Sequence, residues 1–214
     1  IPDSVTSIES EAFSGCKGLG KISGSATNIS TVAKQANPSY FCVNITSGTS
    51  IDKNTFDGFK GLSMVEISGK VTSIGNYAFQ NCSSLWTLTI SDTVTNIGDG
   101  AFNGCTGLRY INGSATNVST VAKQANPTSF SVNITSGTSI SASAFDGCTG
   151  LTNVTIDNNV KSIGSYAFRD CTKLKSITFK GTKAQWNAIS KGTSWKKNVP
   201  SSCSVICSDV TISI

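Results

Sequence analysis

The chain has 214 residues, of which 38% are hydrophobic and 14% are charged, so it can bury a continuous core beneath a surface rich in Ser, Thr, Asn and Gly. Its formal net charge is +5, but the lysines and arginines are scattered until Lys191, Lys196 and Lys197, which excludes the basic stripe expected of a nucleic-acid-binding protein. The chain has no histidine, the commonest general base, and no apolar run of about 18 residues that could span a membrane.

The N-terminal residues begin within a repeated motif. Ile1-Pro-Asp-Ser-Val5 matches the middle of a unit that recurs later, and no signal peptide precedes it. We therefore expect a fragment whose targeting segment lies outside this sequence.

A phenylalanine preceded by Ala or Thr recurs along the chain in steps of 43 and 23 residues. Around most of these positions the sequence reads Val-Thr-Ser-Ile, then Ala-Phe, Cys, Leu and Ile at fixed spacing, as in Val71–Ile90 and Val160–Phe179. Each longer step contains a degenerate unit, so the underlying period is 21 to 23 residues. This period is typical of leucine-rich repeats, in which stacked coils bury the apolar face that one coil cannot bury alone. The six phenylalanines are Phe13, Phe56, Phe79, Phe102, Phe145 and Phe168.

Each regular coil predicts three elements. The pattern Leu-x-x-Ile-x-Ile, as in Leu85–Ile90 and Leu151–Ile156, alternates apolar and polar residues and predicts a strand of a parallel sheet. The pattern Val-x-x-Ile-Gly predicts a shorter extended segment with a turn at glycine. The pattern Ala-Phe-x-x-Cys predicts a single helical turn.

The two degenerate coils carry a longer segment, Gly24–Pro38, which recurs as Gly113–Pro127 with one change, from Ile29 to Val118. It predicts a helix that ends at the proline and is capped at its start by Ser30 or Thr31, or in the second copy by Ser119 or Thr120. The duplication has a period of 89 residues. Residues 1–179 therefore form eight coils in two 89-residue blocks, and residues 180–214 form a C-terminal capping segment.

The repeated motif resembles the BspA-like, Treponema-type leucine-rich repeat of bacterial surface proteins, which also occurs in trichomonad parasites. The residues that carry this resemblance are Ile-Pro-Asp-Ser-Val-Thr-Ser-Ile followed by Ala-Phe-Ser-Gly-Cys and Leu. The resemblance covers about residues 1–179, and Gly181–Ile189 with Trp195 and Cys203–Asp209 resembles the terminal segment of such proteins. We therefore expect an α/β fold: a right-handed leucine-rich-repeat solenoid with a concave parallel β-sheet and a convex side of short strands and helical turns. The resemblance also implies an extracellular or cell-surface location, adhesion, and binding of host proteins.

The cysteines follow the repeat. The third coil has Phe59 at the position where five other coils have cysteine, and a position that accepts either residue is an apolar packing slot. We therefore expect buried free thiols there. Cys203 and Cys207 are better candidates for a disulfide or a metal, but a strand would hold them about 13 Å apart, which favours free thiols. We predict no metal site and no cofactor. The five repeat cysteines are Cys16, Cys82, Cys105, Cys148 and Cys171.

The sequence has none of the usual catalytic patterns. Its acidic residues stand singly, and it contains no phosphate-binding glycine loop, nucleophile elbow or Cys/His arrangement. We therefore predict that the chain is not an enzyme.

The strand positions that face solvent indicate a binding surface. When the Leu-x-x-Ile-x-Ile strands of successive coils are aligned, their second and third positions carry several aromatic residues and an arginine in the middle of the array. Interface hot spots favour this composition. Alternatively, Phe41 and Phe130 point inward because the degenerate coils shift their register. The predicted ligand-binding residues on the concave face are Phe41, Met64, Trp86, Arg109, Tyr110, Asn112 and Phe130.

These observations predict a protein-binding module that is secreted or anchored to the cell surface. Its ligand would be a host matrix or surface protein, or a protein of a neighbouring cell, and not a nucleic acid. One alternative is a structural spacer that projects another domain from the cell. Another is carbohydrate recognition, suggested by Trp86 and Tyr110 beside Asn112.

Overall fold

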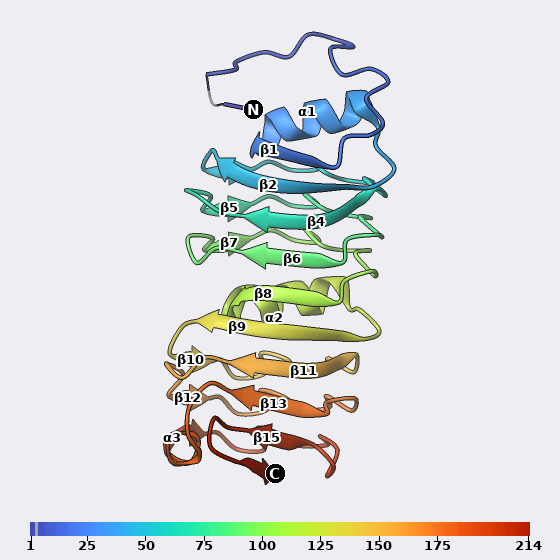
Figure 1. Ribbon diagram of the computed structural model, residues 1–214. Helices are drawn as coiled ribbons and strands as arrows, with labels where there is room; N and C mark the ends of the chain where they lie inside the picture. Colours follow the sequence, from blue (N-terminus) through green and yellow to red (C-terminus); the bar gives the residue numbers. More distant parts are fainter. Residues whose placement is uncertain (3) are drawn as a thin grey trace. The chain divides into compact units, whose positions relative to one another are not determined.

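The computed structural model describes residues 1–2 and 4–214, which form two compact units, Ile1–Leu108 and Arg109–Ile214. Each unit is a stack of coils of the chain, and each coil contributes one strand to a main parallel sheet (Figure 1). The leucine-rich-repeat solenoid predicted from the repeat is therefore confirmed.

In the first unit, the strands of the main sheet lie on one side of the coils and a second, shorter parallel sheet lies on the other. Its main-sheet strands, in spatial order, are β1 (Lys21–Ser25), β2 (Phe41–Ser47), β4 (Leu62–Ile67) and β6 (Thr87–Ile90). The second sheet consists of β3 (Ser50–Ile51), β5 (Ser73–Ile74) and β7 (Asn96–Ile97).

The second unit repeats this plan and adds an antiparallel strand. Its parallel strands are β8 (Tyr110–Ser114), β9 (Phe130–Ser136), β11 (Leu151–Ile156), β13 (Ser176–Phe179) and β15 (Ser204–Ile206). Strand β16 (Thr211–Ser213) runs antiparallel to β15 and covers its outer edge. The second sheet consists of β10 (Ser139–Ile140), β12 (Ser162–Ile163) and β14 (Ser190–Lys191).

The repeat phenylalanines form the centre of each core. The ring of Phe79 stacks between Phe56, with centroids 5.0 Å apart, and Phe102, with centroids 5.2 Å apart, and all three rings are fully buried. In the second unit Phe145 and Phe168 stack in the same way at 5.2 Å. One ring per coil therefore fills the space that stacking creates.

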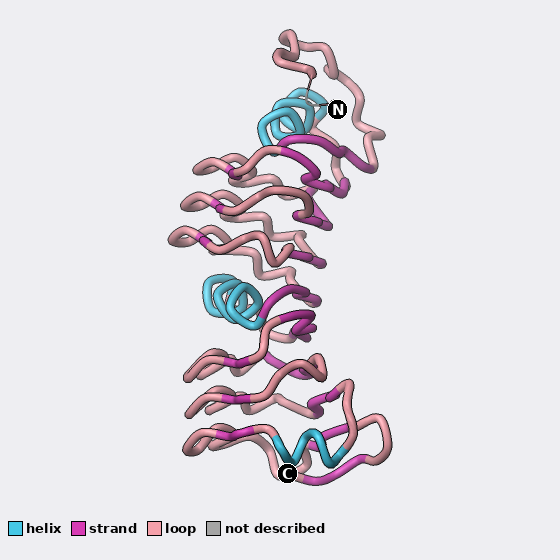
Figure 2. The backbone as a smooth tube through the Cα atoms, turned by 90° about the vertical axis from the view of Figure 1, so that its left-hand side faces the viewer, coloured by secondary structure: helices cyan, strands magenta, loops and turns pink. Residues whose placement is uncertain are grey.

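Helices α1 (Ala26–Ala36) and α2 (Ala115–Ala125) replace the short strand and turn of the degenerate coils. Figure 2 shows them on the side of the coil away from the main-sheet strands. Both end as predicted, at a left-handed asparagine directly before the proline.

The predicted helix starts are wrong. Helix α1 is capped by Ser25, whose hydroxyl accepts a hydrogen bond from the Asn28 N–H at 3.3 Å, and α2 is capped by Ser114 in the same way. The helix begins directly after the main-sheet strand because this start brings its apolar stripe against the core. Ser30 then lies buried in mid-helix, where its hydroxyl donates to the Thr55 carbonyl at 2.7 Å. Thr31, Ser119 and Thr120 likewise donate to backbone carbonyls of their own helix and cap nothing.

The Ala-Phe-x-x-Cys segments are not helical turns. Left-handed residues stand four apart in them, such as Tyr77 at φ 58° and Asn81 at φ 58°, and this interrupts any helix. Their alternate N–H groups instead donate to the carbonyls of the following coil, as from Phe56 to Ala78 at 2.7 Å. We call this row of bonds between coils the turn ladder.

The residues after Lys180 contribute the same elements once more. Helix α3 (Lys183–Ala188) begins with a capping box formed by Thr182 and Gln185. Trp195 then takes the place of a repeat phenylalanine, with its ring 6.2 Å from Phe168, and Trp186 lies 6.1 Å from Trp195.

All eight cysteines are free, and four of the five repeat cysteines are buried as predicted: Cys82, Cys105, Cys148 and Cys171. The thiol of Cys82 donates to the Phe56 carbonyl at 3.0 Å, and that of Cys171 donates to the Phe145 carbonyl at 3.1 Å. Cys16 is exposed, contrary to the prediction, because the first coil packs against α1 on one side only. Cys203 and Cys207 are buried free thiols.

Candidate binding face

The outward side chains of the main-sheet strands form an exposed face in each unit. In the first unit we define the first strand face as Lys21, Ser23, Cys42, Asn44, Met64, Glu66, Trp86, Thr87 and Thr89. The third strand position aligns Lys21 with Cys42, Cys42 with Met64, and Met64 with Thr87, as the sequence predicts. Neighbouring apolar residues such as Val65 point into the core because side chains alternate along a strand.

Met64 and Trp86 are the large apolar side chains of the first strand face. They are 44% and 50% exposed; Met64 stands on β4, and Trp86 directly precedes the neighbouring strand β6. The Trp86 N–H donates to the Ser63 carbonyl at 2.8 Å, which fixes the backbone below both side chains. Cys42 lies on the next strand, half-buried, with its sulfur 3.6 Å from the Ser63 hydroxyl. The structure therefore brings Met64, Trp86 and Cys42 together on rigid backbone.

Phe41 and Phe130 do not belong to an exposed face, and their prediction as ligand-binding residues is wrong. They are 1% and 2% exposed. Phe41 pairs with Leu62 and Cys42 pairs with Met64, so Ser63 forms a one-residue bulge between them. The Ser63 hydroxyl donates to the Phe41 carbonyl at 2.9 Å. The shifted register, which the sequence analysis held as the alternative, is the correct interpretation.

The same bulge recurs in the second unit. Phe130 pairs with Leu151 and Ser131 with Asn153, and the Thr152 hydroxyl donates to the Phe130 carbonyl at 2.8 Å. The sequence does contain the signal for both shifts. The run Phe41-Cys-Val-Asn-Ile45 alternates strictly from its first residue, whereas Leu62–Ile67 has one residue more between its first two apolar positions.

In the second unit Arg109 and Tyr110 are exposed, Tyr110 by 50%, and Asn112 is half-buried. Tyr110 aligns with Ser131 on the neighbouring strand. We define the second strand face as two outward columns. The first column is Tyr110, Ser131, Asn153, Ser176 and Ser204, and the second is Asn112, Asn133, Thr155, Thr178 and Ile206. Apart from Tyr110 and Asn112, which the sequence predicted, the polar side chains of these columns are new functional candidates, which the sequence does not single out because Ser, Thr and Asn are frequent throughout the chain.

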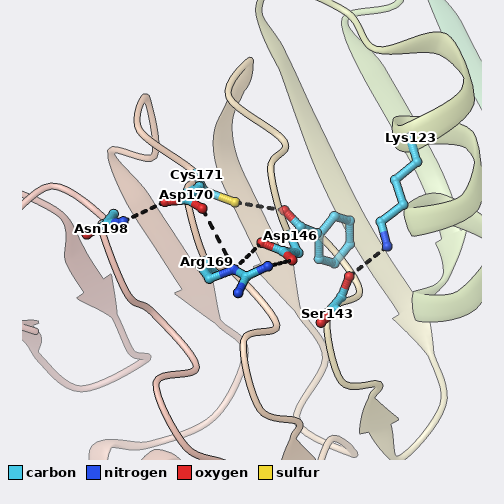
Figure 3. Close-up of polar contacts among 8 residues, drawn as sticks. Lys123, Ser143, Asp146, Arg169, Asp170, Cys171 and Asn198 are labelled. Carbon is cyan, nitrogen blue, oxygen red and sulfur yellow. Dashed lines mark hydrogen bonds and ion pairs between the residues drawn. The ribbon is translucent and has the colours of Figure 1, made fainter.

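The turn ladder of the second unit carries a polar network (Figure 3). Arg169 Nε donates to Asp146 Oδ1 at 2.7 Å, and Arg169 Nη2 pairs with Asp146 Oδ2. The guanidinium also lies 4.8 Å from the ring centre of Tyr166. The hydrogen bond from Arg169 holds the pKa of Asp146 below its usual range. Asp146 therefore stays ionised and ties one coil to the next, which is a structural role.

Comparison with protein families identifies the repeat. A model of the BspA type leucine rich repeat region matches in six copies, over residues 1–109, 39–131 and 116–210. The chain belongs to this BspA-type family. Comparison with curated proteins gave no match.

Solved structures of bacterial leucine-rich-repeat proteins resemble the chain. A leucine rich cell surface protein of Faecalibacterium prausnitzii is 31% identical over 72% of this chain, with a TM-score of 0.40, and the chain spans 36% of its length. A leucine-rich-repeat protein of Treponema pallidum is 21% identical, covers 84% of this chain and 75% of its own, and has a TM-score of 0.38. One from Bacteroides ovatus is 20% identical over 92% of this chain and 47% of its own, with a TM-score of 0.35.

The first unit of this BspA-type chain also has a groove of about 610 Å³ at the end of α1. Its lining includes Lys34, Phe59 and Lys60, and the Phe59 ring packs edge-on against Phe41 at 6.0 Å. The groove forms where the helical coil meets the regular coil whose cysteine slot holds Phe59.

The described residues, 1–2 and 4–214, contain no group of three His, Cys, Asp or Glu side chains that could hold a metal ion. Within the same residues, no helix is both long enough and apolar enough to cross a membrane.

Proposed function

We propose that this BspA-type chain is a non-catalytic protein-binding module of a cell-surface or secreted protein, and that the first strand face is its main contact surface. The observation that carries the proposal is the pair Met64 and Trp86, two large exposed apolar side chains, of which Met64 stands on β4 and Trp86 directly precedes the neighbouring strand β6. The ligand would be a host protein or a protein of a neighbouring cell. We propose the cell-surface location because the similar protein of F. prausnitzii is described as a cell surface protein.

The first strand face has the chemistry of an interface anchor. Trp is enriched at hot spots because it buries a large area with few rotatable bonds, and Met adapts to irregular partner surfaces. Met64 stands on β4, and the Trp86 N–H is hydrogen-bonded to the Ser63 carbonyl beside β6, so binding does not have to order the backbone below them. Glu66 and Lys21 add opposite charges near the rim. This combination favours a protein partner with an apolar patch.

Folding does not require these two side chains. Met64 and Trp86 have Asn153 and Lys175 as their counterparts 89 residues later, on the same backbone. Because the second copy folds the same strands without large apolar side chains there, their presence in the first copy supports a role in binding.

The residues Arg109, Tyr110 and Asn112 remain part of the proposal as the contribution of the second unit. Arg109 and Tyr110 are exposed residue types that hot spots favour. The competing proposal of a structural spacer predicts that no variant of an exposed residue changes binding to any partner.

The test is binding of the purified chain to an immobilised panel of extracellular-matrix and serum proteins, followed by titration of the strongest partner. We expect Trp86→Ala to weaken the affinity about thirtyfold, which corresponds to about 2 kcal/mol, with no change in melting temperature. Tyr110→Ala should weaken binding by a smaller factor.

Lys175→Ala is the matched control, because Lys175 holds the same strand position as Trp86 in the second copy. It should leave the affinity unchanged. Unchanged affinity for Trp86→Ala, or a loss that appears only together with unfolding, would contradict the proposal.

A further inference from the structure

The second strand face differs in chemistry from the first. All ten side chains of its two columns are uncharged, and nine of them are polar: one tyrosine, five hydroxyl residues, Ser131, Ser176, Ser204, Thr155 and Thr178, and three amides, Asn112, Asn133 and Asn153. The tenth is Ile206, at the end of the second column. Charged residues flank the columns and do not stand in them: Arg109 and Lys175 directly precede Tyr110 and Ser176, and Asp157 follows β11. The face is therefore a regular field of neutral hydrogen-bonding groups.

These polar groups are held in position by one another. The amide Nδ2 of Asn153 donates to the Ser176 hydroxyl at 2.8 Å, and the amide Oδ1 accepts from the Ser131 hydroxyl at 3.5 Å. Ser131 also lies 3.3 Å from the Thr152 hydroxyl. Because the side chains are short and mutually bonded, a ligand that contacts them costs little side-chain entropy.

The composition does not favour a protein hot spot. Serine and threonine are under-represented among residues that carry protein–protein binding energy, and serine is depleted at interfaces. It does not favour nucleic acid either, because no lysine or arginine stands in the columns to neutralise phosphates.

The chemistry matches a neutral polysaccharide. Sugar hydroxyl groups both donate and accept hydrogen bonds, and Ser, Thr and Asn offer both functions without charge. Adjacent parallel strands repeat these groups about every 4.8 Å, so a polymer with repeating hydroxyl groups can meet several strands in succession. Tyr110, 50% exposed in the same column as Ser131, supplies a flat ring on which the C–H face of a sugar can stack.

We propose that the second strand face binds a neutral polysaccharide chain, with Tyr110 as the stacking platform and Asn153 as the central hydrogen-bonding residue. This site differs in ligand class from the proposed protein-binding surface and shares only Tyr110 and Asn112 with it.

The test is native electrophoresis of the chain through gels that contain one soluble neutral polysaccharide each: a β-1,3-glucan, hydroxyethylcellulose, mannan, xylan or dextran. We expect at least one to retard the chain. The dissociation constant derived from the retardation should rise about tenfold for Tyr110→Ala and for Asn153→Ala. Tyr110→Phe keeps the ring and should bind nearly as the parent does.

Met64→Ala with Trp86→Ala is the control, because these residues belong to the first strand face. The double variant should be retarded like the parent even though it loses protein binding, which keeps the two proposals distinguishable. Circular dichroism spectra identical to the parent's establish that the Tyr110 and Asn153 variants are folded, and Tyr110→Phe gives a second measure where Tyr110→Ala does not fold. Absence of retardation by every polysaccharide overturns the inference, as does retardation that the Tyr110→Ala and Asn153→Ala variants retain.

Discussion

The two units share a core but differ in the chemistry of their exposed strands. Leu62 and Val65 have Leu151 and Val154 as counterparts 89 residues later, and all four are buried. The outward residues of the same strands differ at most positions: Cys42 corresponds to Ser131, Met64 to Asn153, Glu66 to Thr155 and Trp86 to Lys175. Inward positions must match the coils stacked on both sides, whereas outward positions meet only solvent or a ligand. One backbone thus presents two different surfaces.

The copies also differ in one partly buried hydrogen bond. In the first unit the Ser68 hydroxyl donates to Asn44 Oδ1 at 3.1 Å. The counterparts are Asp157 and Asn133, and a carboxylate cannot donate. Asn133 Oδ1 is accordingly buried without a partner. The second copy therefore carries a polar defect that the first does not.

The largest effect should come from the shared core. We expect Phe79→Ala and its counterpart Phe168→Ala each to lower the free energy of unfolding by about 3–5 kcal/mol, because each ring packs between aromatic rings of two neighbouring coils. Phe13→Ala should cost clearly less, because Phe13 is only half-buried. Urea denaturation measures all three, and an equal loss at Phe13 would contradict the stacking argument.

The buried thiols should make stability depend on alkaline pH. Burial raises the pKa of Cys148 from 9.0 to about 11, and it also raises the pKa of Cys171. A thiol is neutral when protonated, so its contribution is complete below pH 9 and is lost as the pH rises from 9 to about 11. The expected loss is about 1.4 kcal/mol per pH unit for each such thiol.

Denaturation under reducing conditions between pH 8 and 11 measures this slope. Cys148→Ala should reduce the slope of the free energy of unfolding against pH by the contribution of one thiol. The variant should fold, since the first-unit counterpart, Phe59, shows that the position accepts a residue without a thiol. A slope identical to the parent's would mean that Cys148 is not buried as described.

A smaller effect should follow from repairing the polar defect. Asp157→Ser restores the donor found in the first unit and should raise the free energy of unfolding by about 1 kcal/mol. The pair between Asp157 and Lys180, at 3.8 Å and partly exposed, contributes little that would be lost. Asp157 also accepts a hydrogen bond from the Asn159 N–H at 3.1 Å, and a serine hydroxyl can accept this bond as well. Asp157→Ala removes the charge without supplying a donor. If the serine variant is no more stable than the alanine variant, the missing donor is not the cause of the defect.

The smallest effect concerns the exposed strands. Exchanging the counterparts, Trp86→Lys together with Lys175→Trp, should change the free energy of unfolding by less than about 0.5 kcal/mol, because both residues are exposed. Protein binding should nevertheless be lost. A large change in stability would show that Trp86 belongs to the core.

The repeat period predicted the coils, the strands and the core phenylalanines, because these follow from apolar spacing alone. It did not predict the start of α1, because Ser25 and Ser30 are equally plausible caps until the packing of the apolar stripe decides between them. The register shift at Ser63 was only an alternative at the level of the sequence, because the pairing of the two strands decides it. Of the candidate residues, Met64, Trp86, Arg109 and Tyr110 are exposed as expected. Phe41 and Phe130 are buried instead, because the aromatic residue type alone does not distinguish a core residue from an exposed binding residue.

The turn ladder limits how the length of this chain can change. Three alternate N–H groups of one coil meet three carbonyls of the next, as from Tyr77, Phe79 and Asn81 to Asp99, Ala101 and Asn103. Insertion of a single residue into such a segment would misalign all three bonds and move the ring of the phenylalanine out of its stack. Gain or loss of a complete coil leaves every donor opposite an equivalent acceptor. A change in the number of regular coils therefore preserves the turn ladder, whereas insertion of a single residue into a turn breaks it.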